Sequence, residues 1–535
     1  MKRNLIINKL MLGTLALGLF SCTEKYFDIN SNPYQPGNLS ADDYALGSAM
    51  NNLASAVISS DVNTAQFTDC LLGGPCGGYF ADSKAGWSAT ISNYNPTDDW
   101  TYVLMGSPEV IPVLYSNLNT IKIVSDNTNN PVPYAIASII KVAAMDRVTD
   151  TYGPIPYTKI GEDGKISVPY DSQEAVYDAF FNELNVAIAT LSDNKDAALV
   201  ATADYVYGGD VQKWIKFANS LKLRLAMRIV YADEAKAKEM AESAVNQEFG
   251  VIEENADNAA WNYFGSVSNP LFTAVRYNED TSGGDSHPAA DIICYMNGYN
   301  DPRRANYFEP AKFSEGGTYV GLRRSINMQK ADAYFSSYSR IKISSSDPIR
   351  WMNAAEVAFL RAEAVAVFGF NMNGTAEDFY NKGIRLSFEQ YGLSGADAYL
   401  ADATSKPQTY TDPAGLNSYP NTISEITIKW DEAADKEEKQ ERIITQKWIA
   451  NWMLGHEAWA DYRRTGYPKL IPATDEGNKS GGKVDSRRGA RRMPYPAAEI
   501  SGTNSANVAY AIANYLGGLD NMGTDVWWAC KPNNK

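Results

Sequence analysis

Apolar residues recur at three- and four-residue spacing along several long stretches of the chain. This spacing places apolar side chains on one face of a helix, which can then be buried. The pattern predicts helices over residues 41–59, 172–191, 210–230, 350–369 and 375–391. We expect Asp171 with Glu174, and Thr375 with Asp378, to act as capping pairs. Gly392 is expected to end the last helix.

The last two helices are predicted to form an antiparallel hairpin, because only the polar turn 371–374 separates them. The first helix is rich in alanine between residues 354 and 364, so a neighbouring helix can approach it closely. Stacked helix pairs of this kind are typical of tetratricopeptide proteins. No strict repeat of about 34 residues is readable, so any such stack is degenerate.

Loop-rich stretches with many glycine, asparagine, serine and aromatic residues interrupt the helices at 61–100, 262–345, 393–430 and 465–535. Long ordered loops are usually functional. Strand patterns are few, and residues 426–430 are among the better ones. The predicted fold class is mainly α, with a scaffold of helix pairs, a loop-rich irregular lobe and few short strands. Residues 41–535 are predicted to form a single domain, because no linker divides them.

The first 21 residues have the layout of a lipoprotein signal peptide. Three basic residues and no acid are followed by an apolar stretch that is too short to span a membrane. Ser21 directly precedes Cys22, which matches the lipoprotein cleavage site. We predict that residues 1–21 are removed, that Cys22 is acylated and that residues 22–40 form a flexible tether. The alternative is an ordinary signal peptide, with Cys22 a bystander.

Charge limits the partners of this chain. The formal net charge is −15 and the pI is about 4.8. Nucleic acids and anionic lipids attract basic surfaces, so this charge argues against nucleic-acid binding and against electrostatic docking on a membrane. Attachment to a membrane must therefore come from the acyl chains on Cys22.

Four cysteines remain besides Cys22, namely Cys70, Cys76, Cys294 and Cys530. Cys70 and Cys76 could close a small disulfide loop or stay as two free thiols, and the sequence leaves both open. Only two histidines and no paired CxxC spacing are present, which argues against zinc. We predict neither a metal nor a cofactor.

Motifs for catalysis are absent or incomplete. Residues 477–484 have the spacing of a phosphate loop, but Val484 stands where a hydroxyl must hold magnesium. His456 lies in a predicted amphipathic helix over 446–464 and is interpreted as a structural hydrogen-bonding residue. Asp98 and Asp99 could be read as a glycoside hydrolase pair, but adjacent acids more often start a helix. We predict no enzymatic activity.

Several segments, taken in order, resemble those of the SusD-like (RagB-type) nutrient-binding outer-membrane lipoproteins. The matching segments are 148–157, 170–177, 208–214, 220–228, 300–303 with 307–308, 355–364, 446–448, 457–459, 463–468 and 491–496. Each is weak alone, whereas the ordered series is specific. The run RRTGYP at 463–468 indicates the subgroup with this ending.

The resemblance implies about four tetratricopeptide-like helix pairs and a loop-rich ligand-binding lobe. It implies an outer-membrane, lipid-anchored protein at the cell surface that acts as a hinged lid on a TonB-dependent, SusC-like transporter. The implied cargo is an oligosaccharide, with peptide cargo, a surface glycoside hydrolase or a pure scaffold as alternatives. In such proteins the motif residues belong mainly to the scaffold, and the ligand site lies in variable loops.

Ligand-binding residues are therefore predicted from the loops themselves. Aromatic rings stack on the apolar faces of sugars, while neighbouring polar groups bond the hydroxyls. Loops 61–100 and 276–299 carry both residue types, although most rings in the chain are expected to be buried. The predicted stacking residues are Tyr79, Trp87 and Tyr94. The predicted polar or edge contributors are Arg276, Tyr277 and Asp285.

Overall fold

The computed structural model describes residues 44–84, 86–101, 103–161, 167–199, 201–262, 268–313 and 318–534. The predicted signal peptide (1–21), the acylated Cys22 and the tether (22–40) lie outside these residues. Within them the chain is mainly helical with a few short strands, so the predicted fold class is confirmed. No helix of the described part is both long and apolar enough to cross a membrane.

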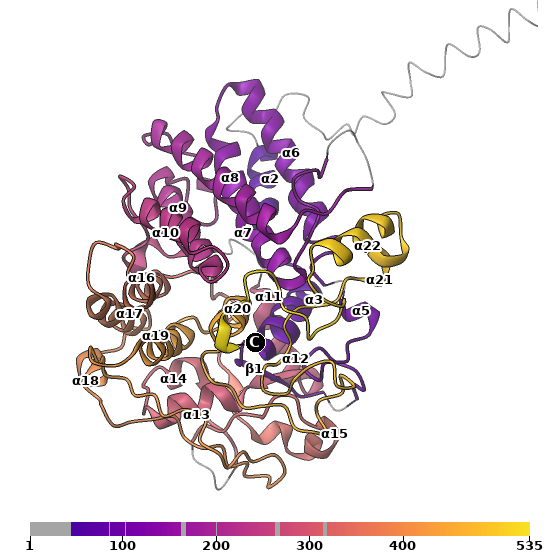
Figure 1. Ribbon diagram of the computed structural model, residues 1–535, viewed down its shortest axis with the longest axis vertical. Coiled ribbons are helices and arrows are strands. Elements are labelled where there is room, and N and C mark those ends of the chain that lie inside the picture. The colour runs from indigo at the N-terminus through magenta and orange to yellow at the C-terminus, as the bar shows by residue number, and fades with distance from the viewer. Residues whose placement is uncertain are drawn as a thin grey trace, which may run out of the picture.

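Four helix pairs form the scaffold of the described chain, and in each pair the two helices pack side by side. The pairs are α2 (Tyr44–Ala54) with α6 (Ile111–Thr128), α7 (Val132–Tyr152) with α8 (Gln173–Asp193), α9 (Val211–Ile229) with α10 (Glu234–Val245), and α16 (Ala354–Phe368) with α17 (Ala376–Gln390). Successive pairs stack, with α6 on α7, α8 on α9 and α9 on α16. Figure 1 shows them following one another in an arc that runs from α6 to α17. This is the predicted tetratricopeptide-like arrangement.

Side-chain caps begin several of these helices, whereas α6 and α7 have none. Thr375 accepts a hydrogen bond from the Asp378 amide at the start of α17, as predicted. The predicted cap of α8 is one residue off, because Ser172 accepts from the Ala175 amide. Asp171 instead accepts hydrogen bonds from the backbone amides of Tyr157 and Thr158. Capping satisfies amides that have no partner within the helix.

The single helix predicted over 446–464 is wrong. The segment belongs to two helices, α19 (Lys436–Ala450) and α20 (Gly455–Thr465), separated by the turn 451–454. Gly455 explains the break, because a Cβ there would lie 2.4 Å from the carbonyl carbon of Gly73. Close backbone packing of a distant loop therefore overrides the local helical pattern.

Strands are short in the described residues and form three antiparallel pairs. These are β1 (Phe80–Asp82) with β3 (Ser286–Pro288), β2 (Ala259–Trp261) with β6 (Ile349–Met352), and β4 (Phe308–Glu309) with β5 (Arg340–Ile341). The strand predicted over 426–430 does not form. The carbonyls of Ile426 and Ile428 accept instead from the hydroxyls of Tyr299 and Tyr380.

Short helices fill much of the loop-rich lobe, and two more lie against the helix pairs. Those before the third strand are α3 (Val62–Ala65), η1 (Gln66–Gly73), α4 (Gly74–Cys76), α5 (Asp98–Thr101), η3 (Ala201–Ala203), η4 (Asn255–Asp257), α11 (Pro270–Phe272), η5 (Thr273–Tyr277) and α12 (Asn278–Ser282). Those after it are α13 (Ala290–Gly298), α14 (Arg304–Tyr307), α15 (Met328–Ala331), η6 (Asp332–Ser337), α18 (Ala396–Leu400), α21 (Ala497–Ser501), α22 (Ser505–Asn514) and η7 (Pro532–Asn534). Of these, η1 and η5 are π-helices.

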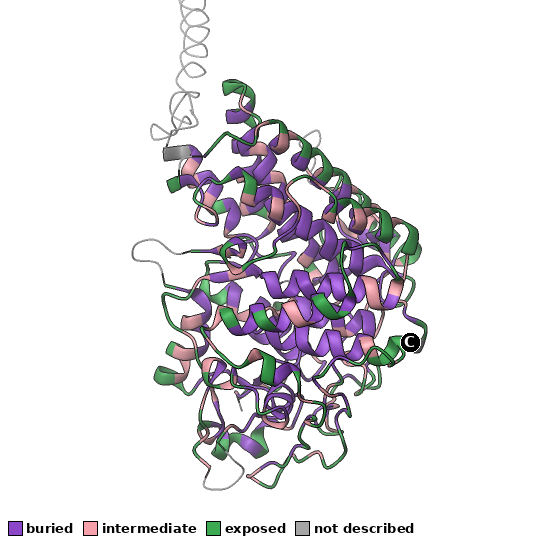
Figure 2. Cartoon of the chain, turned by 90° about the vertical axis from the view of Figure 1, so that its left-hand side faces the viewer, coloured by how far each residue is buried: buried purple, intermediate pink, exposed green. Residues whose placement is uncertain are grey.

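One continuous core runs through the scaffold, and Figure 2 shows its buried helices inside an exposed outer layer. Four fully buried tryptophans are among its largest side chains: Trp214, Trp448, Trp459 and Trp528. A smaller apolar cluster lies in the loop-rich lobe around Leu322. Cys70 and Cys76 are buried free thiols, so the disulfide alternative is not realised.

Candidate functional site

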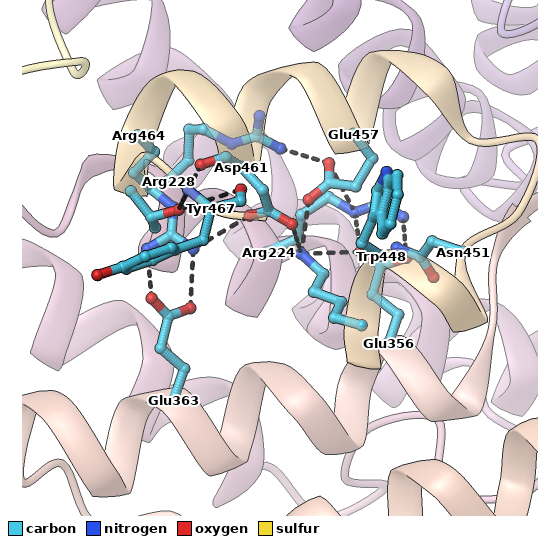
Figure 3. Close-up of polar contacts among 12 residues, drawn as sticks. Arg224, Arg228, Glu356, Glu363, Trp448, Asn451, Glu457, Asp461, Arg464 and Tyr467 are labelled. Atoms are coloured by element: carbon cyan, nitrogen blue, oxygen red, sulfur yellow. Dashed lines mark hydrogen bonds and ion pairs between the residues drawn. The ribbon is translucent and has the colours of Figure 1, made fainter. Parts of the chain in front are cut away.

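Two regions with charged residues bear on function, one buried throughout and one at the surface around the buried Asp285. The buried charge network consists of Asp150, Arg224, Arg228, Glu356, Glu363, Lys447, Glu457, Asp461 and Arg464. It joins α7, α9, α16, α19 and α20, and Figure 3 shows most of its members meeting between these helices. Every residue of the network except Asp461 lies in a segment that resembles the SusD-like family.

The first half of the network centres on two arginines of α9. Arg224 makes a bidentate pair with Glu356, at 2.7 Å and 2.8 Å. Arg228 lies 2.9 Å from Asp150 and also contacts Glu457. Arg228, Lys447 and Arg224 outweigh burial and hold the pKa of Glu457 well below its usual range. This carboxylate is therefore charged and fully engaged.

The second half of the network ties α20 to α16. Arg464 makes a bidentate pair with Glu363, at 2.7 Å and 2.8 Å, and Figure 3 shows the two side chains facing each other. Lys447 lies 2.8 Å from both Glu457 and Asp461. Burial lowers the pKa of Lys447, but Asp461, Glu457 and Glu356 together raise it. These groups satisfy one another, which is the expected arrangement for buried charges in a scaffold.

A small polar cavity of about 50 Å³ adjoins this network and is lined by Asp146 and His456. It has room for only a few water molecules. His456 lies 2.9 Å from the carbonyl oxygen of Thr68, and burial lowers its pKa to about 3. The prediction that His456 is a structural hydrogen-bonding residue is confirmed. A neutral imidazole held in this way ties α20 to η1.

The second region, which we name the loop face, lies where the two predicted loops meet. It consists of Gln66, Phe67, Lys84, Trp87, Trp100, Arg276, Tyr277, Asn278 and Asp285. Pairing of β1 with β3 brings residues 80–82 against 286–288. Figure 1 shows α3, α5, α12 and β1 close together in this part of the molecule.

Asp285 is the polar centre of the loop face. Its carboxylate accepts hydrogen bonds from the side-chain amides of Gln66, at 2.6 Å, and Asn278, at 2.7 Å. The ammonium of Lys84 lies 3.7 Å away. One acid thus joins η1, the loop after β1 and α12. A carboxylate with amide neighbours can also bond the hydroxyls of a ligand.

Aromatic rings form a chain across the loop face. Trp87 meets Trp100 edge to face, with ring centroids 5.0 Å apart. Trp100 meets Phe67 in the same way at 5.1 Å. All three rings are partly exposed, and Trp87 also packs on the smaller apolar cluster. Contacts between the rings fix their orientation, which suits them to stack on a ligand.

Arg276 and Tyr277 lie at the end of η5, where their side chains differ in exposure. Tyr277 is 57% exposed. Arg276 is held by Glu279, at 3.3 Å, and by Glu309, at 3.2 Å. Tyr277 is free to contact a ligand, whereas the guanidinium of Arg276 already has carboxylate partners.

Two of the predicted stacking residues are buried. Tyr79 is fully buried, stacks on Trp448 and donates a 2.5 Å hydrogen bond from its hydroxyl to the Trp448 carbonyl. Tyr94 is 8% exposed and has a backbone φ of 60° in the turn that holds it. Neither ring offers a free face to a sugar, so the geometry counts against both as stacking residues. The ligand-binding roles of Trp87, Arg276, Tyr277 and Asp285 stay predictions.

Sequence reasoning missed four residues of the loop face that contact the predicted ones: Gln66, Phe67, Trp100 and Asn278. Trp100 and Phe67 lie within the aromatic-rich stretch 61–100, which was the available signal. The amides carried no signal, because Gln66 is far from Asp285 in the sequence and Asn278 reaches it only through the fold of residues 278–285. Within the described residues, no group of three His, Cys, Asp or Glu side chains is placed to hold a metal ion.

The chain is similar to known proteins over most of its length. A family model for SusD-like proteins (Susd and RagB outer membrane lipoprotein) matches residues 28–529. A SusD homolog from Bacteroides uniformis is 72% identical with a TM-score of 0.90, covering 92% of this chain and 100% of that chain. A homolog from Bacteroides thetaiotaomicron is 41% identical (TM-score 0.83), and a chitin-binding SusD homolog from Flavobacterium johnsoniae is 37% identical (TM-score 0.83), each with the same coverage. No curated protein matches the chain.

Proposed function

The chain belongs to the SusD-like family of outer-membrane lipoproteins, and on this premise we propose that it is a non-catalytic protein that captures oligosaccharides at the cell surface. The observation that carries the proposal is the loop face, where the ring chain Phe67–Trp100–Trp87 lies beside the polar centre at Asp285. Rings stack on the apolar faces of sugars, and amides and carboxylates bond their hydroxyls. The chitin-binding family member supports a carbohydrate ligand.

The proposal includes the anchor and the partner implied by the family. We propose that Cys22 is acylated after removal of residues 1–21 and that residues 22–40 link it to the body. The protein would then act as a hinged lid on a TonB-dependent, SusC-like transporter. We also assign it to the subgroup with the RRTGYP ending at 463–468, on the sequence alone.

The first experiment tests the loop face as the binding site. The chain from residue 23 onward is titrated calorimetrically with a panel of neutral and acidic oligosaccharides that includes chitin fragments. Tyr277→Ala and Trp87→Ala are each expected to weaken binding by about tenfold, because each loses about 1.4 kcal/mol of contact. Tyr510→Ala is the matched control, since Tyr510 on α22 is 57% exposed, as Tyr277 is. Equal affinities for Tyr277→Ala and Tyr510→Ala would contradict the assignment of Tyr277.

The second experiment tests the remaining parts of the proposal. Release of shorter products during incubation with these glycans would overturn the non-catalytic interpretation. Binding of peptide pools in place of every glycan would favour the peptide alternative. Isolation of the membrane form should recover a large outer-membrane barrel protein together with this chain. Failure to recover such a barrel protein would contradict the role as a transporter lid.

A further inference from the structure

A cavity of about 460 Å³ lies between β6, α11 and the turn that joins α19 to α20. Its walls include Trp452 and Met453 from the turn, Tyr391 at the end of α17 and Arg350 on β6. Its volume falls within the range of small-molecule sites, at roughly 300–1,000 Å³. The cavity does not share a lining residue with the loop face.

Three polar side chains at this cavity have no hydrogen-bond or ion-pair partner among the described residues. Trp452 is 6% exposed, and its indole N–H donates no hydrogen bond to that part of the chain. The Arg350 guanidinium faces the ring of Tyr391, with 5.8 Å between them, and meets no described carboxylate. The Asn306 side-chain amide is likewise unengaged within the described chain. An indole N–H at a cavity wall usually has an acceptor, so an acceptor is expected from a ligand or from solvent.

The charges at the cavity favour an anion. Lys342 adds a second cation, and its ammonium donates a 2.8 Å hydrogen bond to the Ala305 carbonyl. The one acid of the lining is Asp347, which accepts from the backbone amide of Ser344. Indole, guanidinium and ammonium groups are donors only. A ligand rich in acceptors therefore fits this lining, in a protein whose overall charge is −15.

The wall at the turn is built with backbone strain and aromatic packing. Met453 has a φ of 80°, an uncommon value for a residue with a side chain. The preceding Trp452 stacks on Tyr307, with ring centroids 5.4 Å apart and an interplanar angle of 11°. Such strain persists where surrounding packing fixes it, often at binding sites. The turn thus holds the indole edge rigidly at the cavity.

We propose that this cavity binds the carboxylate-bearing ring of an acidic sugar, with Arg350 and the Trp452 indole N–H as its donors. Arg350 can hold a carboxylate through two parallel N–H donors, and Tyr391 supplies an apolar wall for the sugar ring. This inference rests on the proposed function and narrows its ligand to oligosaccharides that contain a uronic acid. A single uronic acid residue would occupy the cavity while neighbouring sugars extend outward.

Ligand-observed NMR with small probes tests the cavity apart from the loop face. The probes are glucuronic acid, glucose, glucose 6-sulfate and N-acetyl-trialanine, each added to the chain from residue 23 onward. Saturation transfer is expected for glucuronic acid. The affinity for glucuronic acid, measured from this signal, should weaken about tenfold in Arg350→Gln. Arg350→Lys keeps the charge without the planar fork, so it should recover only part of the affinity. Arg385→Gln is the control, because Arg385 is an exposed arginine paired with Asp397.

A second variant protects the result against a folding defect. Trp452→Phe removes the N–H but keeps an aromatic ring in the packed turn. It should weaken glucuronic acid binding without changing the melting temperature of the protein. The proposal is overturned if glucose, the sulfate or the peptide binds as tightly as glucuronic acid. It is also overturned if Arg350→Gln leaves glucuronic acid binding unchanged. Neutral glycans that bind while glucuronic acid fails would overturn this inference alone, whereas glucuronic acid that binds while no oligosaccharide does would overturn the proposed function alone.

Discussion

The buried charge network and the loop face use similar residue types for opposite purposes. In the network, each charge is removed from solvent and meets at least one opposite charge, and Glu457 meets three. In the loop face, Asp285 meets amides and a more distant lysine, and the neighbouring rings keep partly exposed surfaces. The first arrangement leaves no group free for a ligand, while the second leaves contact surface available.

This difference explains where the family resemblance is carried. Breaking a buried ion pair leaves an uncompensated charge, so residues of the network cannot change singly without a large loss of stability. Partly exposed residues of the loop face can change with little effect on folding. Sequence motifs of the family therefore lie in its scaffold and do not identify the ligand.

The largest effect is expected inside the network, at Glu363→Ala. Glu363 is fully buried and accepts from Arg464 and Gln440, so its loss leaves the buried Arg464 guanidinium with Asp461 as its remaining carboxylate and the Gln440 amide without this acceptor. We expect a loss of about 3–5 kcal/mol in the free energy of unfolding, measured by denaturant titration. Arg385→Ala, at the exposed pair with Asp397, should change it by less than about 1 kcal/mol. Similar losses for both variants would remove the distinction between buried and exposed charge.

The next largest effect on stability is expected at Asp82 of β1, a buried residue beneath the loop face. Asp82 is 3% exposed, and Thr90 is the neighbouring hydroxyl that favours the charged form of its carboxyl. Burial and the nearby Asp285 raise its pKa to about 8. Between about pH 4 and pH 8 the folded chain thus holds one more proton at this site than the unfolded chain. Stability contributed by this site falls as the pH rises through that window.

Asp82→Asn removes this titration while keeping the shape of the side chain. Relative to the wild type, the variant should gain stability by about 1.4 kcal/mol per pH unit between pH 5 and pH 7. Chemical denaturation of both proteins at several pH values measures the difference. A difference that does not depend on pH would show that Asp82 is ionised in the folded protein.

The helical scaffold was predictable because each helix carries its own periodic pattern. The hairpin of α16 and α17 and the cap at Thr375 follow from local sequence alone. The break at 451–454 was not predictable, since it depends on contact between Gly455 and the distant Gly73. The segment 426–430 has a strand pattern, but no partner strand reaches it in the described residues.

The candidate site was predictable at the level of loops and not at the level of rings. Composition identified the stretches 61–100 and 276–299, which β1 and β3 bring together. Tyr79 and Trp87 lie in the same stretch, yet Tyr79 is buried against Trp448, far away in the sequence, and Trp87 is partly exposed. Which ring is buried depends on this long-range packing, and no local signal encodes it.

A smaller effect is expected at Tyr79→Phe, which tests that distinction between rings. The variant keeps the stacked ring and removes the hydroxyl that donates to the Trp448 carbonyl. We expect a loss of about 1–2 kcal/mol in unfolding free energy and no change in oligosaccharide affinity. Calorimetric unfolding and ligand titration measure the two quantities. Weaker ligand binding at unchanged stability would show that Tyr79 is a binding residue after all.

The smallest effect on stability is expected at Asp285→Asn, within the loop face itself. An asparagine oxygen can still accept from Gln66 or Asn278, but the charge that attracts Lys84 is lost. Asp285 itself is 7% exposed, but its one cation, Lys84, is partly exposed and lies 3.7 Å away, so the lost charge pair contributes little and the unfolding free energy should fall by about 1 kcal/mol. Oligosaccharide affinity should fall several-fold, because the carboxylate positions η1 and α12 and is itself a strong acceptor. A stability loss as large as that of Glu363→Ala, without any change in affinity, would place Asp285 with the scaffold and leave the rings as the only part of the loop face that binds ligand.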